Sequence, residues 1–308
     1  MDMNLPYALM QSPDRIVGRP SSDGMDFPFS PQLKVNFVKE QRAMWSRWTP
    51  EPRPCFNPQL LRDIRAYYEF LSQTHGQVYD GVDDHPLEYV VLASGVPGVF
   101  NMGGDLDLFK QLIETRDRAG MLTYGRACID VLYRNYLGHD LPLTTISLVQ
   151  GECLGGGFEA ALSSDIVIAE KSSRFGFPEI LFNLFPGMGA YSFLDRRVGQ
   201  KLTEELLTSG KIYSAEEMLT LGVIDVVAED GQGEAEVAAL IRRRSRNRNG
   251  LAALAAVRRR VHSIDFEELL HVVEIWVDSA LRLNPRDLKL MHRLVNKQNH
   301  LGDSQQVH

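Results

Sequence analysis

The chain has 308 residues, of which 44% are hydrophobic and 24% are charged. That length can bury one large core and support a smaller appended domain, and the composition is typical of a globular protein. The formal net charge of −7 argues against a nucleic-acid-binding protein. The three cysteines form no CxxC pair and the eight histidines show no metal-ligand spacing, so we expect no disulfide framework and no metal site.

The chain begins without the features of a secreted or membrane protein. Residues 1–30 are rich in Pro, Ser, Asp and Gly, and no basic segment followed by an apolar run occurs among them. We expect an irregular N-terminal extension there. The most apolar stretches are too short to cross a bilayer. We therefore expect no membrane span and a reducing, cytoplasmic location.

The first regular elements follow this extension. Leu33–Val38 alternates apolar and polar residues, which predicts a strand. Asn57 followed by Pro58 is typical of a helix start, and the apolar spacing after it is helical. Gly76 ends that helix, and the polar segment Gln77–Pro86 is predicted to be a loop.

Strands and helices then alternate, which predicts an α/β core over residues 31–233. The continuous apolar run at Tyr89–Ala93 indicates a buried strand. Ser214 and Glu217 form a capping box at the start of a helix. Further strands are predicted at Leu143–Val149, Asp165–Ala169 and Val223–Ala228, and further helices at Phe158–Leu162 and from Asp105 onward.

After Gly233 the pattern becomes helical. Glu234–Arg244 and Leu251–Val261 have helical spacing, and a long amphipathic helix is predicted to start at Asp265. We therefore predict a helical C-terminal domain over residues 234–308, with a boundary near residue 233. Its apolar stripe is wider than one small domain needs, so we expect these helices to mediate assembly.

Three glycine-containing segments could carry chemistry: Asn101–Leu106, Gly151–Ala160 and Phe175–Ile180. Glycines just before a helix let a ligand approach the backbone closely. The first N–H groups of a helix have no internal partner and lie at the positive end of its dipole. Such a place can stabilise a developing negative charge, for example the enolate oxygen of a thioester.

Two glutamates accompany these segments. Glu159 falls in the first turn of the helix that Gly156 begins, and Pro178 makes Glu179 an early residue of the next helix. Two carboxylates delivered by two loop-to-helix turns can form an acid/base pair. From the residues alone a plainer interpretation stays open, in which the glycines form tight turns and the glutamates are surface residues favoured by the helix dipole.

A dinucleotide-binding loop is a weaker alternative. Gly155, Gly157 and Ala160 match the loose glycine fingerprint of such loops. However, four residues, Gly151–Leu154, separate these glycines from the preceding strand, and the expected strand–helix units do not surround them.

The three segments together, in their order and spacing, resemble the sequence motifs of the crotonase (enoyl-CoA hydratase/isomerase) superfamily. The resemblance covers roughly residues 33–290. It implies a spiral core of repeated strand–strand–helix units with a C-terminal all-helical domain. It also implies an oxyanion hole from the amides of Gly104 and Gly156, and catalytic carboxylates at Glu159 and Glu179, which are 20 residues apart as in the hydratases.

A narrower resemblance is to the diffusible-signal-factor synthases, bacterial homologues that make cis-2-unsaturated fatty acids. The segments Glu179–Phe193 and Glu274–Asp278 carry it, together with the long N-terminal extension. It implies dehydration of a 3-hydroxyacyl group on acyl carrier protein, hydrolysis of the thioester, and a quorum-sensing product. It further implies that a sensor-kinase receiver domain can bind. No cofactor is implied.

The same resemblance suggests an acyl pocket. Met188 and Trp276 match positions that line the acyl tunnel of these synthases, although both could be plain core residues. Phe182 and Phe185 lie near enough in sequence to help build an apolar pocket around the carboxylates.

The resemblance also bears on assembly. Relatives commonly form trimers, so we expect a homo-trimer or a dimer of trimers. The basic run Arg242–Arg248 could attract an acidic carrier protein or could be a solvated helix face.

Two other functions remain open. The chain could be an ordinary enoyl-CoA hydratase that acts on coenzyme A esters. It could also be a non-catalytic regulator that keeps the fold for binding, although the retained pair Glu159 and Glu179 argues against this.

Overall fold

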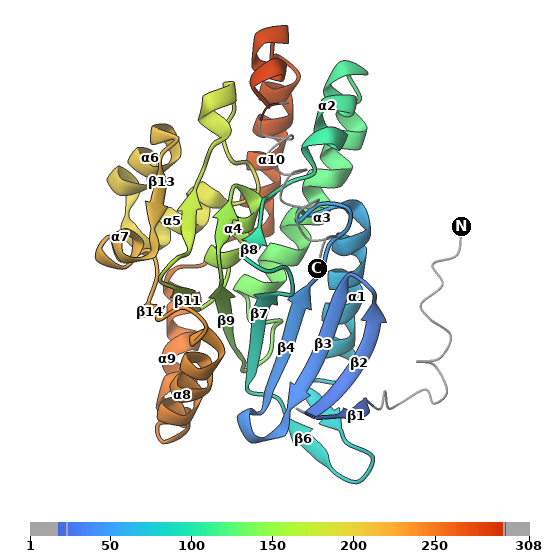
Figure 1. Ribbon diagram of the computed structural model, residues 1–308, viewed down its shortest axis with the longest axis vertical. Helices are drawn as coiled ribbons and strands as arrows, with labels where there is room; N and C mark the ends of the chain where they lie inside the picture. The colour runs from blue at the N-terminus through green and yellow to red at the C-terminus, as the bar shows by residue number, and fades with distance from the viewer. Residues whose placement is uncertain (1–17, 23, 292, 294–308) are drawn as a thin grey trace.

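The computed structural model describes residues 18–22, 24–291 and 293, which fold into a mixed α/β structure (Figure 1). The expectations for residues 1–17 and 294–308 lie outside the described residues. The helices are α1 (Pro58–Gln73), α2 (Leu106–Glu114), α3 (Arg118–Tyr136), α4 (Gly156–Leu162), α5 (Ala190–Val198), α6 (Gln200–Ser209), α7 (Ala215–Thr220), α8 (Gly233–Ser245), α9 (Arg248–Val261) and α10 (Phe266–Ala280), with 3-10 turns η2 (Lys39–Gln41) and η3 (Glu179–Phe182).

The central element is an eight-stranded sheet in the order β1-β2-β3-β4-β7-β9-β11-β14. The pairs from β1 to β4 are antiparallel, and those from β4 to β14 are parallel. Its strands are β1 (Arg19–Ser21), β2 (Gly24–Ser30), β3 (Leu33–Val38), β4 (Ala43–Trp48), β7 (Tyr89–Ser94), β9 (Thr144–Val149), β11 (Ile166–Glu170) and β14 (Val226–Ala228).

A second sheet has four strands in the order β13-β12-β10-β8, and β5 (Gln77–Tyr79) pairs with β6 (Asp84–Pro86). Within the second sheet β8, β10 and β12 are parallel, and β13 runs antiparallel to β12. The strands are β8 (Val99–Asn101), β10 (Glu152–Leu154), β12 (Arg174–Gly176) and β13 (Ile212–Ser214).

Both faces of the large sheet are covered, which explains the continuous apolar run in β7. Val90 and Leu92 belong to the main core, which also contains residues of α1 and α3. Tyr89 and Val91 belong to a smaller cluster on the other face, where α8 contributes Val237. A strand buried on both faces needs apolar residues at successive positions rather than at alternate ones.

The chain passes repeatedly through the two sheets. After β7 it forms β8 and then α2, after β9 it forms β10 and then α4, and after β11 it forms β12 and then η3. Each turn of this path therefore gives one strand to each sheet and ends in a helix. The expected α/β architecture of repeated strand–strand–helix units is confirmed.

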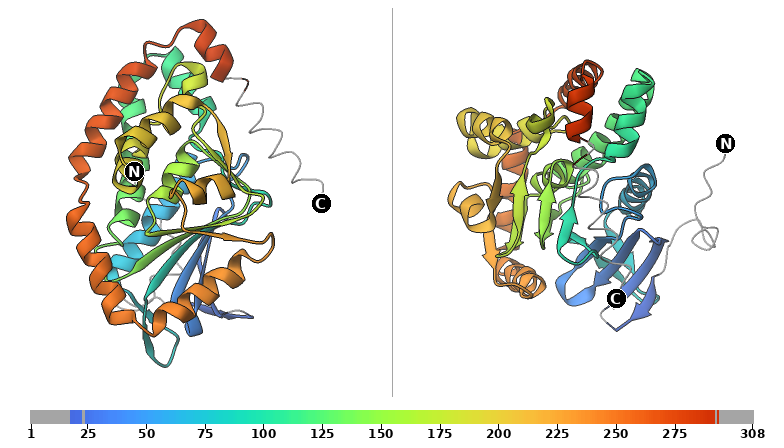
Figure 2. Two further views of the ribbon diagram at one scale, coloured as in Figure 1. Left: turned by 90° about the vertical axis from the view of Figure 1, so that its left-hand side faces the viewer. Right: turned by 45° about the horizontal axis from the view of Figure 1, so that its top comes forward.

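After β14, the described residues contain helices and no further strand. Helix α8 packs against β9 and β11, and α9 and α10 follow along one side of the molecule (Figure 2). A separate domain with a boundary near residue 233 stays a prediction.

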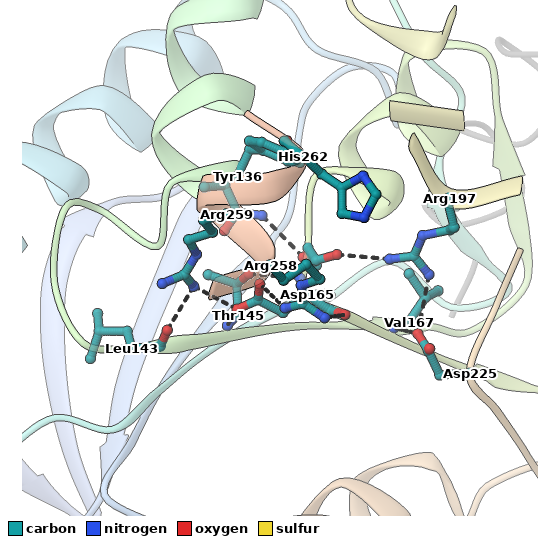
Figure 3. Close-up of polar contacts among 12 residues, drawn as sticks. Tyr136, Leu143, Thr145, Asp165, Val167, Arg197, Asp225, Arg258, Arg259 and His262 are labelled. Carbon is teal, nitrogen blue, oxygen red and sulfur yellow. Dashed lines mark hydrogen bonds and ion pairs between the residues drawn. The ribbon is translucent and has the colours of Figure 1, made fainter. Parts of the chain in front are cut away.

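Asp165, just before β11, binds side chains of α9 and so links this helix to the core (Figure 3). Its carboxylate accepts hydrogen bonds from Arg258 and from Arg259, the latter at 2.7 Å. It also accepts the Thr145 N–H at 3.0 Å, and Arg259 donates further to the carbonyl oxygen of Leu143 at 2.8 Å. Both arginines lie in the last turn of α9, so a carboxylate that they share with a strand amide holds this end of α9 in one place, just before α10.

Two local predictions were wrong. Residues 24–30, expected to be irregular, form β2, in which buried Met25, Phe27 and Phe29 alternate with exposed residues and so pair well with β3. The segment Gln77–Pro86, expected to be a loop, forms the hairpin β5–β6 because buried Val78 anchors it to the core.

Candidate active site

The three glycine-containing segments lie side by side at one edge of the small sheet. Each overlaps one of the parallel, adjacent strands β8, β10 and β12 of the small sheet and continues beyond the carboxyl end of that strand. The carboxyl ends of parallel strands meet at the same edge, so the sheet order brings the segments together. The short strands β8, β10 and β12 were not predicted, because a strand of three residues gives too weak a sequence pattern.

The first two segments touch backbone to backbone. Gly103 has φ +92°, and an ideal Cβ on it would lie 2.9 Å from the Gly156 nitrogen, which no side chain tolerates. Asn101 Oδ1 shapes this turn by accepting the Gly103 N–H at 2.7 Å. A Cβ on Gly156 would in turn lie 3.5 Å from the Gly104 nitrogen, so the two predicted oxyanion-hole amides are neighbours.

The amides of Gly104 and Gly156 are available to a ligand. Within the described part of the chain, neither N–H donates a hydrogen bond to the protein. Gly156 is the first residue of α4, where no intrahelical acceptor exists. Both residues line the same cavity. Two adjacent free donors of this kind can hold an oxygen atom that gains negative charge.

Glu159 lies in the first turn of α4, as predicted, but it is more buried than a surface carboxylate. It is only 1% exposed, and its Oε1 accepts the N–H groups of Met188 at 2.8 Å and Ala190 at 3.0 Å. Burial raises the pKa of Glu159 to about 7, although the two amide donors act in the opposite direction. The group can therefore hold or release a proton near neutral pH.

Glu179 begins the 3-10 turn η3, directly after Pro178. Its Oε2 is buried and has no hydrogen-bond partner among the described residues. Burial, and then the charge of Glu159, raise the pKa of Glu179 to about 8. A buried carboxyl oxygen without a hydrogen-bond partner is unfavourable for folding, which is a common sign of a group kept for chemistry.

Both carboxyl groups face a cavity of about 180 Å³. Of the predicted pocket residues, Met188, Trp276 and Phe182 line it. Phe185 is not among the described residues that line the cavity; it is half-buried and packs against the main core. The structure therefore brings seven of the eight predicted site residues to one cavity, and it leaves Phe185 outside.

Several residues of this cavity were not predicted as site residues. Phe109 of α2 stacks edge-on against Trp276 and against Tyr124, with ring centroids 5.0 Å apart in each pair. Tyr124 donates its hydroxyl to the Phe56 carbonyl oxygen. The signal for Phe109 was present, since it lies on the apolar face of the helix that directly follows Gly104. Helix α3 contributes four residues to the lining: Tyr124, Cys128, Val131 and Leu132.

The arrangement suits proton transfer next to a carbonyl group. Two carboxyl groups that titrate near neutrality can act as an acid and a base, and the paired amides can stabilise an enolate. Among the described residues there is no cluster of His, Cys, Asp and Glu that could hold a metal ion. No described helix is both long enough and apolar enough to span a membrane.

Comparisons with known proteins identify the family of the chain. A family model described as enoyl-CoA hydratase/isomerase matches residues 71–270. A probable mitochondrial enoyl-CoA hydratase 2 of Arabidopsis thaliana is 28% identical over 185 residues, which are 59% of this chain and 55% of that protein. The chain spans about half the length of the curated relatives it matches.

Solved structures share the fold. DspI of Pseudomonas aeruginosa superimposes with a TM-score of 0.63 and 21% identity over 77% of this chain and 90% of DspI. An enoyl-CoA hydratase of Bacillus halodurans gives a TM-score of 0.68 and 21% identity over 85% of this chain and 99% of that protein. Because the family model matches residues 71–270, which are more than half of the chain, the chain belongs to the enoyl-CoA hydratase/isomerase family, the crotonase superfamily.

Proposed function

We propose that the protein dehydrates a 3-hydroxyacyl group carried as a thioester and then hydrolyses that thioester, which releases a free cis-2-unsaturated fatty acid. The observation that supports the chemistry is the pair Glu159 and Glu179 on one cavity beside the free amides of Gly104 and Gly156. The synthase-like segments Glu179–Phe193 and Glu274–Asp278 support the finer substrate assignment.

Dehydration would use both carboxyl groups. The thioester oxygen accepts hydrogen bonds from the amides of Gly104 and Gly156, so the neighbouring Cα becomes more acidic. Ionised Glu179 takes the Cα proton while protonated Glu159 gives its proton to the departing 3-hydroxyl group. The products are water and a double bond between C2 and C3, with Glu179 now protonated and Glu159 ionised.

Hydrolysis would restore the starting state. Ionised Glu159 takes a proton from a water molecule that adds to the thioester carbonyl, and Glu179 gives its proton to the leaving thiol. The acid and the free thiol are released, and each glutamate returns to its first protonation state. The two half-reactions therefore leave the pair unchanged without any external base.

The electrostatics of the pair suit this exchange of protons. Burial raises the pKa of Glu159 to about 7, and burial together with the charge of Glu159 raises the pKa of Glu179 to about 8. Each carboxyl group can therefore hold or release a proton near neutral pH, as an acid and a base must.

A second function has its own support. The family match and the hydratase relatives favour an enoyl-CoA hydratase that adds water to trans-2-enoyl coenzyme A esters. That reaction uses the same carboxyl groups and amides in reverse and requires no hydrolysis. The two functions differ in carrier, in double-bond geometry and in whether a free acid appears.

One incubation separates them. Purified protein is given a medium-length 3-hydroxyacyl group on acyl carrier protein and, separately, the coenzyme A ester, and the products are resolved by chromatography. Release of a free cis-2-enoic acid from the carrier-linked substrate supports the synthase. If a trans-2-enoyl coenzyme A ester is the only efficient substrate, and water is added to it without release of an acid, the protein is an enoyl-CoA hydratase and the synthase proposal is wrong. No turnover of any substrate would favour a regulatory binding protein.

The resemblance also guides proposals about partners and place. We propose a cytoplasmic protein that works as a homo-trimer or a dimer of trimers, and a receiver domain of a sensor kinase as a regulatory partner. A pull-down of the purified protein with isolated receiver domains, in which bound protein is identified by mass spectrometry, tests whether a receiver domain binds.

A further inference from the structure

The active-site cavity is separated from a second hollow by only two side chains. Leu61 of α1 and Tyr124 of α3 line the cavity and also line an open groove of about 1130 Å³ on the outer side of α1 and α3. Both side chains are buried. The same two residues therefore form a wall between the active-site cavity and the outer groove.

The cavity has an exposed mouth and a buried inner end. Leu181 and Ile212 line it and are exposed, so the ligand enters beside them. Leu61 and Leu132 line it and are buried, which places them away from solvent. A chain that enters past Leu181 and continues inward meets the wall formed by Leu61 and Tyr124.

The cavity is small for its proposed ligand. Its volume of about 180 Å³ lies below the range of roughly 300–1,000 Å³ that is usual for small-molecule sites. A long acyl chain together with its thioester head needs more room than that. Additional room exists only if the chain can pass the wall into the groove, or if the wall limits the chain to shorter lengths.

The two wall residues differ in how firmly they are held. The Tyr124 hydroxyl donates to the Phe56 carbonyl oxygen and accepts the Asp105 N–H at 3.3 Å, and its ring packs edge-on against Phe109. Leu61 has only apolar contacts for its side chain, and it can change rotamer without breaking a hydrogen bond. Leu61 is therefore the residue that an incoming chain would displace.

The groove beyond the wall can accept an apolar chain. Its apolar lining includes half-buried side chains from α2, α3 and the start of α10: Leu108, Leu112, Ala127, Tyr133, Leu137 and Phe266. Arg126 lies over the Phe266 ring, 5.7 Å from its centroid, so its stem extends the apolar surface. Half-buried apolar walls that continue an acyl cavity suit the far end of the same chain.

We propose that the groove on the outer side of α1 and α3 binds the distal end of a long acyl chain, and that Leu61 sets the chain length at which this extension begins. The inference rests on the proposed function only in taking the ligand to be an acyl thioester. Shorter chains stay within the closed cavity, and longer ones move Leu61 aside and lie along the groove.

The test uses binding rather than turnover. S-octyl, S-dodecyl and S-hexadecyl pantetheine thioethers carry the part shared by coenzyme A and acyl carrier protein, and they cannot be dehydrated or hydrolysed. Their affinities are measured by calorimetry for the wild type, Leu61→Ala and the matched control Leu132→Ala. Leu132 lines the cavity but not the groove, so its truncation enlarges the cavity and leaves the wall closed.

Each additional buried methylene strengthens binding by about fourfold. We expect Leu61→Ala to raise the affinity ratio of hexadecyl to octyl at least tenfold and Leu132→Ala to leave that ratio within about twofold. Adding Ala127→Trp to Leu61→Ala should obstruct the groove one helical turn from Tyr124 and remove the gain, while octyl binding stays unchanged. Equal ratios in the two leucine variants, or a gain that survives Ala127→Trp, would overturn the proposal.

Two further outcomes are distinguishable. If Ala127→Trp changes the molar mass by light scattering and no chain-length ratio changes, the groove is an interface between copies and the proposal is wrong. If the binding ratios shift as expected but the protein dehydrates no 3-hydroxyacyl thioester, the groove assignment holds and the proposed function fails.

Discussion

The Oε1 atom of Glu179 lies directly over Gly155, so that an ideal Cβ on Gly155 would be 2.5 Å from it. Gly155 also has φ +52°, a conformation that other L-residues adopt with strain. The glycine therefore does more than form a turn. It leaves the space in which the second carboxyl group sits.

Gly155→Ala should displace the Glu179 carboxyl group and reduce turnover of a 3-hydroxyacyl thioester by about 100-fold, because a misplacement of about 1 Å can have that effect. Gly222→Ala is the matched control, since Gly222 has φ +74° and nothing within 4 Å of an added Cβ. Both variants should lose similar stability in thermal melts. Equal activity in the two would show that Gly155 acts only through backbone strain.

Replacement of either glutamate should remove dehydration. Glu159→Gln and Glu179→Gln should each lower the rate by roughly 10²–10⁴-fold while the fold is retained, as measured by steady-state kinetics and circular dichroism. Glutamine suits Glu159 because its amide oxygen can still accept the N–H groups of Met188 and Ala190. If either variant is folded and keeps near-full activity, the assigned mechanism is wrong.

Alanine at the same positions should separate structure from chemistry. Glu159→Ala leaves two buried N–H groups unpaired and should destabilise the protein by about 1–3 kcal/mol, whereas Glu179→Ala removes a group with an unpartnered oxygen. Denaturant unfolding measures the difference, and equal stabilities of the two variants would contradict the assigned contacts.

The raised pKa of Glu179 predicts a pH dependence of stability. Its value of about 8 lies above the ordinary 4.5, so the folded state holds a proton that the unfolded state has released between these values. The contribution of this group is full below 4.5 and is lost as the pH rises through about 8. Glu179→Gln should therefore raise the melting temperature above pH 8 and have little effect below pH 4.5. A uniform shift at all pH values would contradict the burial of this carboxyl group.

Much of the fold could be predicted because its patterns are local. Leu33–Val38 is β3 as expected, and the capping box of Ser214 and Glu217 starts α7. Helix α3 was missed, since glycines and polar residues interrupt its apolar face, and β4 was missed because both its faces are buried. Neither gives a clean period of two or 3.6 residues.

The chemical centre of the site could be predicted and its inner wall could not. Glu159 and Glu179 lie on short segments whose glycines and proline mark loop-to-helix turns in the sequence itself. Leu61, Tyr124 and Leu132 reach the cavity only because α1 and α3 pack together, and core helices look alike in sequence whatever they enclose. Contacts between distant segments leave no local periodic signal.

Trp276 should control the size of the acyl site. Its indole packs over the backbone of Gly187, where an ideal Cβ would lie 2.3 Å from it, and against the ring of Phe109. Trp276→Ala should enlarge the cavity and shift the products toward longer chains by several-fold per methylene, as measured by mass spectrometry of released acids. Trp45→Ala also removes a buried indole, but on the other face of the large sheet. If both variants kept the original product profile, Trp276 would be a core residue only.

Assembly through the C-terminal helices is the last prediction. Helix α9 exposes Leu254, Val257 and Val261 by 63%, 56% and 68%, and their spacing places them on one stripe of the helix. Such a stripe on a surface helix indicates an interface rather than a free surface. We expect a homo-trimer or a dimer of trimers by light scattering at micromolar concentration. Val257→Asp should lower the molar mass because a charge would be buried in the interface, whereas Ala256→Asp adds the same charge beside the stripe and should lower it less. A wild-type protein that is monomeric at this concentration would leave the stripe unexplained and the predicted assembly wrong.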